Sequence, residues 1–309
     1  MAKWLKVPDI AVDRDTFPIL ALLSRDEQHR LRSDTTCVEM AADVAVISEG
    51  QQPSSLFLVY RGLLMVSKRH HHDIFDVGFV TPGEAFGEAS ILYDTPANAE
   101  VRTTEPSVLL QCPAGTVRDI LRTNTRFRRA LEQLAERRMA ASAMAINAVF
   151  SKLPQAARET MLYNARFISL DAGETLFEED QSDTHFMYLV LGGRAEATVT
   201  SPRTPDQRIL FANIGAGDEI GEISIITGRS HAATVTATAP MHLLKINNET
   251  IQSWLKRYPD FGYALYACVQ RKLQHALEGM RDLIGEEEAK KRTIGALPPA
   301  DRIIAAPPS

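Results

Sequence analysis

One motif occurs twice in this chain, at an interval of 134 residues. The first copy reads F-G-E-A-S-I-L-Y-D-T-P-A-N-A-E-V around Gly87, and the second reads I-G-E-I-S-I-I-T-G-R-S-H-A-A-T-V around Gly221. The match continues downstream, where Pro106 aligns with Pro240. A repeat of this length indicates two copies of one domain, each of about 130 residues.

The elements predicted from hydrophobic periodicity and turn residues follow the same order in both copies. They are helices at 17–31 and 148–163, strands at 57–66 and 188–197, hairpin tips at 68–73 and 201–208, turns at 81–84 and 215–218, and helices at 125–150 and 260–284. Gly62 aligns with Gly193, as a tight turn or bulge between strands requires. Short strands with frequent turns predict an α+β, mainly β protein with a barrel or roll in each copy.

We therefore expect a first domain at 1–150, which ends in a long connecting helix, and a second domain at 151–285. The acidic and proline-containing segment 286–309 is expected to be a disordered tail. Apolar residues recur at heptad spacing in the last helix, namely Tyr266, Val269, Leu273, Ala276, Met280 and Leu283. This seam either packs on its own barrel or pairs with a second chain to form a homodimer through residues 260–284.

Charge and cysteine content exclude several classes of protein. The net charge is −5, and 17 of the 34 basic residues lie in each half, whereas nucleic-acid binding needs a clustered basic excess. Cys37, Cys112 and Cys268 cannot form a paired framework and are expected to be reduced core residues. No stretch reaches the ~18 apolar residues of a membrane helix, and the first residues lack a signal-peptide pattern. We expect a cytoplasmic protein without direct DNA binding or a membrane span.

The doubled motif resembles the phosphate-binding cassette of cyclic-nucleotide-binding domains, which reads G-E-x-A-L-L-x-x-x-P-R-x-A-x-V. Such domains occur in catabolite-activator-type regulators, in regulatory subunits of cyclic-AMP-dependent protein kinase and in cyclic-nucleotide-gated channels. The similarity covers about residues 17–284. It implies two jelly-roll β-barrels, each flanked by helices, that bind a cyclic nucleotide without a cofactor or a metal.

The resemblance also implies a set of ligand-binding residues. Glu88 and Glu222 would hold a ribose hydroxyl, while the amides near Ser90 and Ser224 would face a phosphate. The alternative for the two glutamates is a structural salt bridge or a turn cap. The full implied set is Phe86, Gly87, Glu88, Ala89, Ser90, Asn98, Ala99, Ile220, Gly221, Glu222, Ile223, Ser224, Arg229, His231, Ala232, Ala233 and Thr234.

The chain departs from the family pattern at the arginine that clamps the phosphate. Ala97 stands there in the first copy and His231 in the second. Loss of a charge-assisted hydrogen bond costs ~1.5–3 kcal/mol, or roughly ten- to hundred-fold in affinity. In the second copy Arg229 or a protonated His231 could substitute, whereas the first copy has no cation between Gly87 and Val101. We therefore expect the second copy to be the better site for an anion.

Other motifs give no further function. His70 to His72 with Asp73 resembles a metal tract but is expected to be a solvated hairpin tip, and Arg128-Arg129 is expected to lie on a helix face. No phosphate loop, H-E-x-x-H, G-x-S-x-G or C-x-x-C motif occurs, so no enzyme is predicted and no catalytic residue is assigned. We expect neither a kinase-docking segment before Asp15 nor a DNA reader after Ile284.

Three functions remain open. The first is a second-messenger sensor that signals to a protein partner through the connecting helix. The second is a receptor for a cyclic dinucleotide such as cyclic di-GMP, for which the available arginines are Arg69, Arg102, Arg203, Arg208 and Arg229. The third is a ligand-free scaffold.

Overall fold

The computed structural model of the 309-residue chain describes residues 3–5, 15–70, 73–164, 166–182, 185–201, 204, 207–284, 286, 289–290 and 297–304. The chain divides into two compact units at residues 1–138 and 139–309, rather than at the expected boundary after residue 150. Helix α4 (Thr125–Ile146) begins in unit 1 and ends in unit 2. Just beyond the end of this helix, Asn147 donates to Gly217 O and to the Glu219 carboxylate, both also in unit 2.

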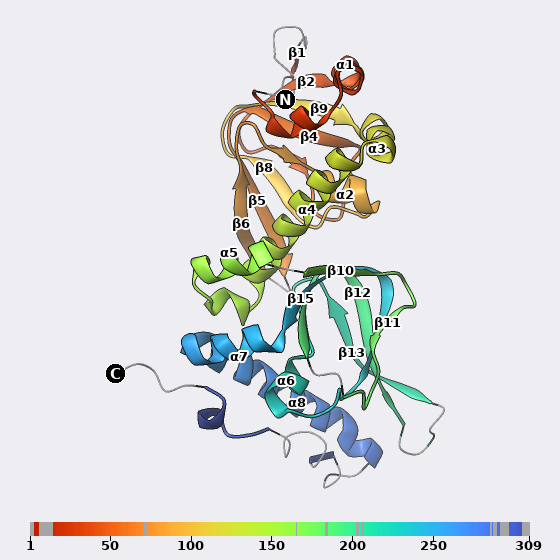
Figure 1. Cartoon of the computed structure of the whole chain (residues 1–309), viewed down its shortest axis with the longest axis vertical. Helices are drawn as coiled ribbons and strands as arrows, with labels where there is room; N and C mark the ends of the chain where they lie inside the picture. The colour runs from red at the N-terminus through yellow and green to blue at the C-terminus, as the bar shows by residue number, and fades with distance from the viewer. Residues whose placement is uncertain are drawn as a thin grey trace. The chain divides into compact units, whose positions relative to one another are not determined.

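Unit 1 is a roll of two antiparallel sheets with helices packed on one side (Figure 1). The sheets have the orders β1-β2-β9-β4-β7 and β3-β8-β5-β6. The strands are β1 (Lys3–Leu5), β2 (Thr36–Met40), β3 (Ala45–Ile47), β4 (Ser55–Arg61), β5 (Leu64–His70), β6 (Asp73–Val80), β7 (Ala85–Phe86), β8 (Glu100–Thr103) and β9 (Ser107–Pro113). Besides α4, the helices are η2 (Pro18–Leu22), α1 (Arg25–Asp34), α2 (Glu88–Tyr93) and α3 (Ala114–Thr123).

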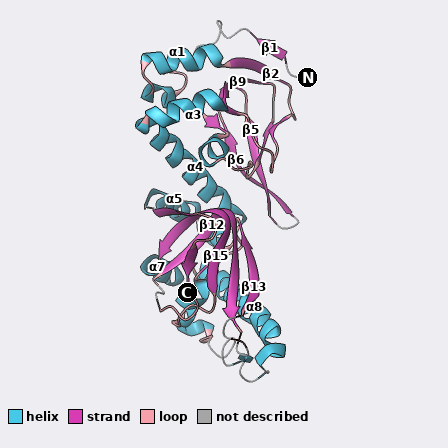
Figure 2. Cartoon of the chain, turned by 90° about the vertical axis from the view of Figure 1, so that its right-hand side faces the viewer, coloured by secondary structure: helices cyan, strands magenta, loops and turns pink. Residues whose placement is uncertain are grey.

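Unit 2 repeats this plan with longer strands (Figure 2). Its sheet has the order β10-β15-β12-β13, with β11 paired to β15 and β14 paired to β12. The strands are β10 (Arg166–Leu170), β11 (Thr175–Phe177), β12 (Phe186–Thr200), β13 (Arg208–Gly215), β14 (Glu219–Ile220) and β15 (Thr234–Asn247). The helices are η3 (Phe150–Lys152), α5 (Gln155–Asn164), α6 (Glu222–Thr227), α7 (Asn248–Arg257), α8 (Pro259–Ile284) and η5 (Ala300–Arg302). The predicted fold class is confirmed.

The paired glycines of the sequence explain why the two sheets bend alike. Gly62 has φ +104° and Gly193 has φ +91°, which favour glycine. A Cβ at Gly62 would lie 2.1 Å from Ser107 Oγ, and one at Gly193 would lie 2.2 Å from Pro240 O. At this point β12 runs on across register shifts, whereas unit 1 divides the same stretch into β4 and β5.

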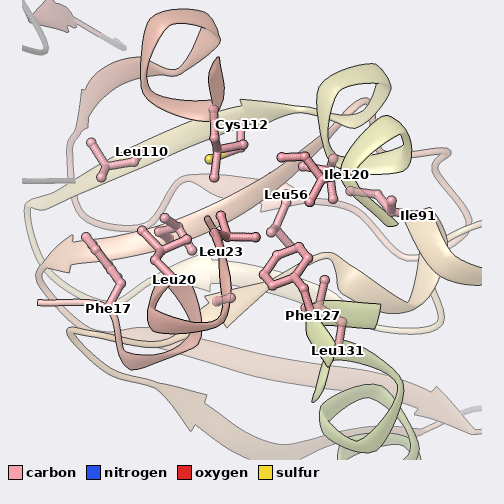
Figure 3. Close-up of a cluster of buried hydrophobic side chains, with 14 of the residues drawn as sticks. Phe17, Leu20, Leu23, Leu56, Ile91, Leu110, Cys112, Ile120, Phe127 and Leu131 are labelled. Carbon is pink, nitrogen blue, oxygen red and sulfur yellow. The ribbon is translucent and has the colours of Figure 1, made fainter. Parts of the chain in front are cut away.

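Two faces of the unit 1 sheets bury separate clusters. On the helical side, η2, α3 and α4 cover β4 and β9 with Phe17, Leu20, Ile120, Phe127 and Leu131 (Figure 3). Between the sheets lies the inter-sheet core of unit 1, which comprises Val38, Ile47, Phe57, Val59, Leu64, Val80, Phe86, Val101 and Leu109. The equivalent cluster of unit 2, which we call the inter-sheet core of unit 2 by analogy although its strands form one sheet, comprises Phe177, Tyr188, Val190, Ala195, Ala197, Val199, Ile220, Ala233, Val235, Ala237, Met241 and Leu243.

The expected hairpin tip at 68–73 is wrong in part. Lys68 to His70 belong to β5 and Asp73 begins β6, because the strand alternation continues through the basic residues. His71 and His72 lie outside the described residues, as do Arg203 and three neighbours in the second tip. Among the described residues, no group of three or more His, Cys, Asp or Glu side chains is placed to hold a metal ion.

The last helix packs on its own unit. Val269, Leu273 and Ala276 of the predicted seam are buried within unit 2, which agrees with the first of the two interpretations. The side chains of Met280 and Leu283 lie outside the described residues. No helix in the described part of the chain is both long and apolar enough to cross a membrane.

Part of the expected disordered tail has an ordered position. The Tyr266 hydroxyl donates to Pro298 O at 3.0 Å, and Ile304 is buried against α8 at Gly262. Residues 297–304 therefore differ from the expected disordered tail, because the Ile304 side chain and the Pro298 carbonyl both contact α8. All three cysteines are free and buried, as expected.

Candidate functional site

The two cassettes fold alike around a glycine in the left-handed region. Gly87 (φ +85°) joins β7 to α2, and Gly221 (φ +86°) joins β14 to α6. A Cβ at Gly87 would lie 3.1 Å from Ser55 O, and one at Gly221 would lie 2.8 Å from Phe186 O. The glycine therefore lets the cassette approach a neighbouring strand closely, and it directs the following glutamate into the protein.

Each cassette glutamate is buried beside a cation from the long helix that follows its barrel. Arg138 Nη1 of α4 lies 3.5 Å from Glu88 Oε2, and Lys272 Nζ of α8 lies 3.0 Å from Glu222 Oε1. Only 5% of Glu88 and 3% of Glu222 is exposed. The two cations are themselves 134 residues apart, so the repeat interval also relates Arg138 to Lys272. We call these contacts the cassette–helix ion pairs.

The two ion pairs differ in their second acid. Lys272 Nζ also lies 3.0 Å from Glu219 Oε1, whereas the position of Glu219 is held by Ala85 in unit 1. Arg138 instead donates to Ala85 O and to Glu84 Oε1, the latter at 3.2 Å. The Glu219 carboxylate further accepts from Cys268 Sγ at 2.7 Å.

These contacts shift the pKa values of the acids in opposite directions. Burial raises the pKa of Glu88 above its ordinary value, and Arg138 opposes this shift. Burial likewise raises the pKa of Glu222 against the opposing charge of Lys272. For Glu219, burial is outweighed by Lys272 and by three hydrogen bonds, which lower the pKa to about 2. Of the two acids beside Lys272, Glu219 is thus the one that keeps its negative charge most firmly.

His231, which occupies the arginine position of the second cassette, fills the barrel of unit 2. Its ring stacks on Phe177 with 3.7 Å between centroids, and its Nδ1 lies 3.1 Å from Ser224 Oγ. Only 3% of His231 is exposed. The residue expected to contact an anion is therefore held between an aromatic ring and the cassette serine.

The other residues implied by the family resemblance differ in how deeply they are buried. Phe86, Ser90, Ile220, Ser224, Ala233 and Thr234 are buried, Gly87, Ala89, Asn98, Ala99, Gly221 and Ile223 are half-buried, and Arg229 and Ala232 are exposed. Ala97 packs against the inter-sheet core of unit 1. Thr234 accepts from the Arg208 guanidinium and from Glu179 N, the latter at 3.0 Å.

The arginines considered for a cyclic dinucleotide have other positions. Arg102 bonds to Glu100 at 2.8 Å and to Asp43 at 3.2 Å, while Arg69 and Arg229 are exposed. Arg203 lies outside the described residues. Arg208, in contrast, donates to Thr234, one of the implied cassette residues, so one of these arginines does reach the second cassette.

Three cations near the barrels were missed from the sequence. Arg138 and Lys272 were hidden among other charged helix residues, although the 134-residue interval would have paired them. Lys68 falls in the expected hairpin tip at 68–73, yet only 3% of it is exposed. Its equivalent after Gly193 is Val199, and this apolar residue could have signalled an interior position.

A separate cavity of about 750 Å³ lies in unit 2 between α5, α7 and strands of the sheet. It is lined by basic and aromatic side chains that include Arg166, Lys245, Phe186, Trp254 and Arg257, and Lys245 Nζ lies 3.7 Å above the Phe186 ring. None of the residues implied by the cassette resemblance lines this cavity.

A family model described as the cyclic nucleotide-binding domain matches residues 37–124 and 167–258, which is more than half of the chain. Patatin-like phospholipase domain-containing protein 7 of Rattus norvegicus is 22% identical over 266 residues, which cover 85% of this chain but 18% of that protein. The cAMP-dependent protein kinase regulatory subunit of Yarrowia lipolytica is 25% identical over 210 residues, which cover 68% of this chain and 51% of that subunit.

Among solved structures, the regulatory domain of Toxoplasma gondii PKA with cAMP is 21% identical. The match covers 84% of this chain and 94% of that domain, with a TM-score of 0.39. The chain spans about a fifth of the length of the patatin-like relatives, and the match to them lies within its own two repeats.

Proposed function

Because the chain belongs to the cyclic nucleotide-binding domain family, we propose that it is a non-enzymatic sensor of a cyclic-nucleotide second messenger. It acts in the cytoplasm and relays binding to a protein partner. The observation that carries this proposal is the pair of cassette–helix ion pairs, which join each predicted ribose-binding glutamate to the helix after its barrel. These ion pairs give a direct route from a ligand to a helix.

The relay follows from competition for one carboxylate. We infer that a ribose hydroxyl donating to Glu88 competes with Arg138 for this buried carboxylate. The ligand then favours the arrangement in which Arg138 has left the cassette. A ligand shifts such an equilibrium only by its differential affinity for the two arrangements. Since Arg138 lies in α4, its release frees the helix that continues into unit 2.

Calorimetric titration of the full chain with cyclic AMP and cyclic GMP tests this proposal. We expect binding that weakens at least several-fold in Glu88→Gln or Glu222→Gln, because the neutral amide loses a charge-assisted hydrogen bond. Ligand should also speed hydrogen exchange in the helix whose ion pair it breaks. Absence of heat and of thermal stabilisation at millimolar nucleotide would overturn the sensor.

A scaffold without a ligand is the second candidate, and the filling of the barrel of unit 2 favours it. His231 and Phe177 occupy their barrel by stacking, and both glutamates already have protein partners. A His231→Arg variant separates the two functions. For a sensor it restores the family cation and should tighten nucleotide binding, whereas for a scaffold it should only disturb packing.

A further inference from the structure

Lys68 is a buried ammonium in unit 1. Only 3% of the residue is exposed, and Nζ has no hydrogen-bond partner among the described residues. Arg69, its neighbour on β5, is exposed. A buried charge without a partner costs free energy in the ligand-free protein. The position therefore needs an explanation other than stability.

The second repeat shows which way this position faces. Counted from the paired glycines, Lys68 is equivalent to Val199, which belongs to the inter-sheet core of unit 2. The local backbone is the same in both, since Arg69 N donates to Glu49 Oε2 at 2.9 Å and Thr200 N donates to Glu179 Oε2 at 2.7 Å. Lys68 therefore extends into the interior of the first barrel.

The cassette position where Ala97 replaces the family arginine is linked to the strand that carries Lys68. Gly50 N donates to Ala97 O at 2.7 Å, and Ala97 N donates to Gln51 O at 2.8 Å. The loop that carries Glu49 thus links the strand of Lys68 to the position where the family has arginine. The small Ala97 side chain leaves this position without a cation of its own. Burial lowers the pKa of Lys68 and Glu49 partly offsets this, so Glu49 is the acid whose charge reaches the ammonium.

We propose that Lys68 supplies the positive charge that the first cassette lacks, and that the first barrel therefore binds the phosphate of the ligand. This inference rests on the proposed function and reverses the ranking of the two barrels expected from the sequence. Lysine binds phosphate as a point charge and does not need the fork geometry of arginine. In the second barrel Val199 offers no charge, the exposed Arg208 is already bonded to Thr234, and the stacked His231 occupies the interior.

The test uses the full chain and three variants. Lys68→Met removes the charge at similar length, Arg69→Met removes the adjacent exposed charge as a control, and His231→Ala alters the second barrel. In calorimetric titration with cyclic AMP, we expect Lys68→Met to weaken binding by about ten- to hundred-fold, the worth of a charged hydrogen bond. Arg69→Met should stay within about two-fold because exposed charges contribute little.

A second measurement separates this inference from the proposed function. With ¹³Cε-labelled lysine, the Lys68 resonance, identified by its loss in Lys68→Met, should shift on saturation with cyclic AMP. If cyclic AMP binds but neither the affinity nor this resonance depends on Lys68, the inference is wrong while the sensor stands. If no cyclic nucleotide binds, the proposed sensor is wrong. Titration with inorganic phosphate then tests separately whether Lys68 forms an anion site. A phosphate-induced shift of its resonance supports the anion site, and no shift overturns it.

Discussion

The first barrel encloses Lys68 where the second encloses Val199, and the second encloses His231 where the first has Ala97. The first interior thus has a charge and a small residue, while the second is filled by a ring stacked on Phe177. Both nevertheless keep the cassette–helix ion pair. Two copies that share a fold and a helix contact have therefore diverged at positions that face the interior of the barrel.

The largest effect should come from removing the cation of the second ion pair. Lys272→Met leaves Glu219 and Glu222 buried without their shared counter-charge. Breaking a buried pair on one side costs about 3–5 kcal/mol. Arg138→Met leaves only Glu88 buried without its cation, because the other partner, Glu84, is 41% exposed and remains hydrated. This variant should therefore lose less stability, about 1–3 kcal/mol.

The loss of stability in each variant is measured by urea unfolding, with hydrogen exchange monitored separately in each unit. Arg122→Met serves as a control, since its ion pair with Asp119 lies on the surface and is worth ~1 kcal/mol or less. The comparison of the two units fails if Arg138→Met proves as damaging as Lys272→Met.

The second effect is a pH dependence of stability that comes from Glu219, and unit 1 has no equivalent because Ala85 holds that position. Lys272 and its hydrogen bonds lower the pKa of Glu219 from 4.5 to about 2 despite burial. A lowered carboxylate pKa stabilises the fold above the ordinary value, and the stabilisation is lost as the pH falls. The unfolding free energy of the wild type minus that of Glu219→Gln should fall by ~3 kcal/mol between about pH 5 and about pH 2.

A Trp4→Phe background makes Trp254 the sole tryptophan, so its fluorescence reports on unit 2. Burial raises the pKa of Glu222, so its contribution to stability is present at acid pH and is lost as the pH rises above 4.5, opposite in sign to the change expected for Glu219. A difference that stays constant from pH 5 to pH 2 would contradict the assignment of Glu219 as the charged partner.

The third effect has the opposite sign from an ordinary core mutation. Lys68→Val gives the first barrel the residue of the second and removes a buried ammonium without a partner. We expect the ligand-free protein to gain about 1–3 kcal/mol of unfolding free energy. Arg69→Val, its exposed neighbour, should change stability by less than ~0.5 kcal/mol. A net loss of stability in Lys68→Val would show that the ammonium has a stabilising partner.

The sequence predicted the rolls because their determinants are local. The turns at 81–84 and 215–218 and the glycine pair Gly62 and Gly193 recur in both copies, and each acts through nearby backbone geometry. The cassette–helix ion pairs were not predicted, since Arg138 lies 50 residues after Glu88 and only helix packing selects it among the α4 cations.

The position of Lys68 was mispredicted for a different reason. A run of Lys, Arg and His is typical of a solvated tip, and its charge outweighed the strand alternation that continues from Leu64 through Val66. Burial of one member of such a run depends on strand pairing with β6, which the composition does not encode. Comparison with Val199 in the second copy was the available signal.

The smallest effect concerns the ring that fills the second barrel. His231→Ala makes this position equivalent to Ala97 and removes the stacking on Phe177 and the contact with Ser224 Oγ. Aromatic stacking is worth ~0.5–1.5 kcal/mol beyond area burial, so unit 2 should lose about 1–2 kcal/mol in thermal unfolding. The opened interior still lacks a buried cation at the position of Lys68, because Val199 is apolar and the exposed Arg208 is held by Thr234. Hence His231→Ala alone should not raise nucleotide affinity, whereas His231→Ala with Val199→Lys should reproduce the first barrel and bind. Binding by the single variant would mean that space, rather than charge, separates the two repeats.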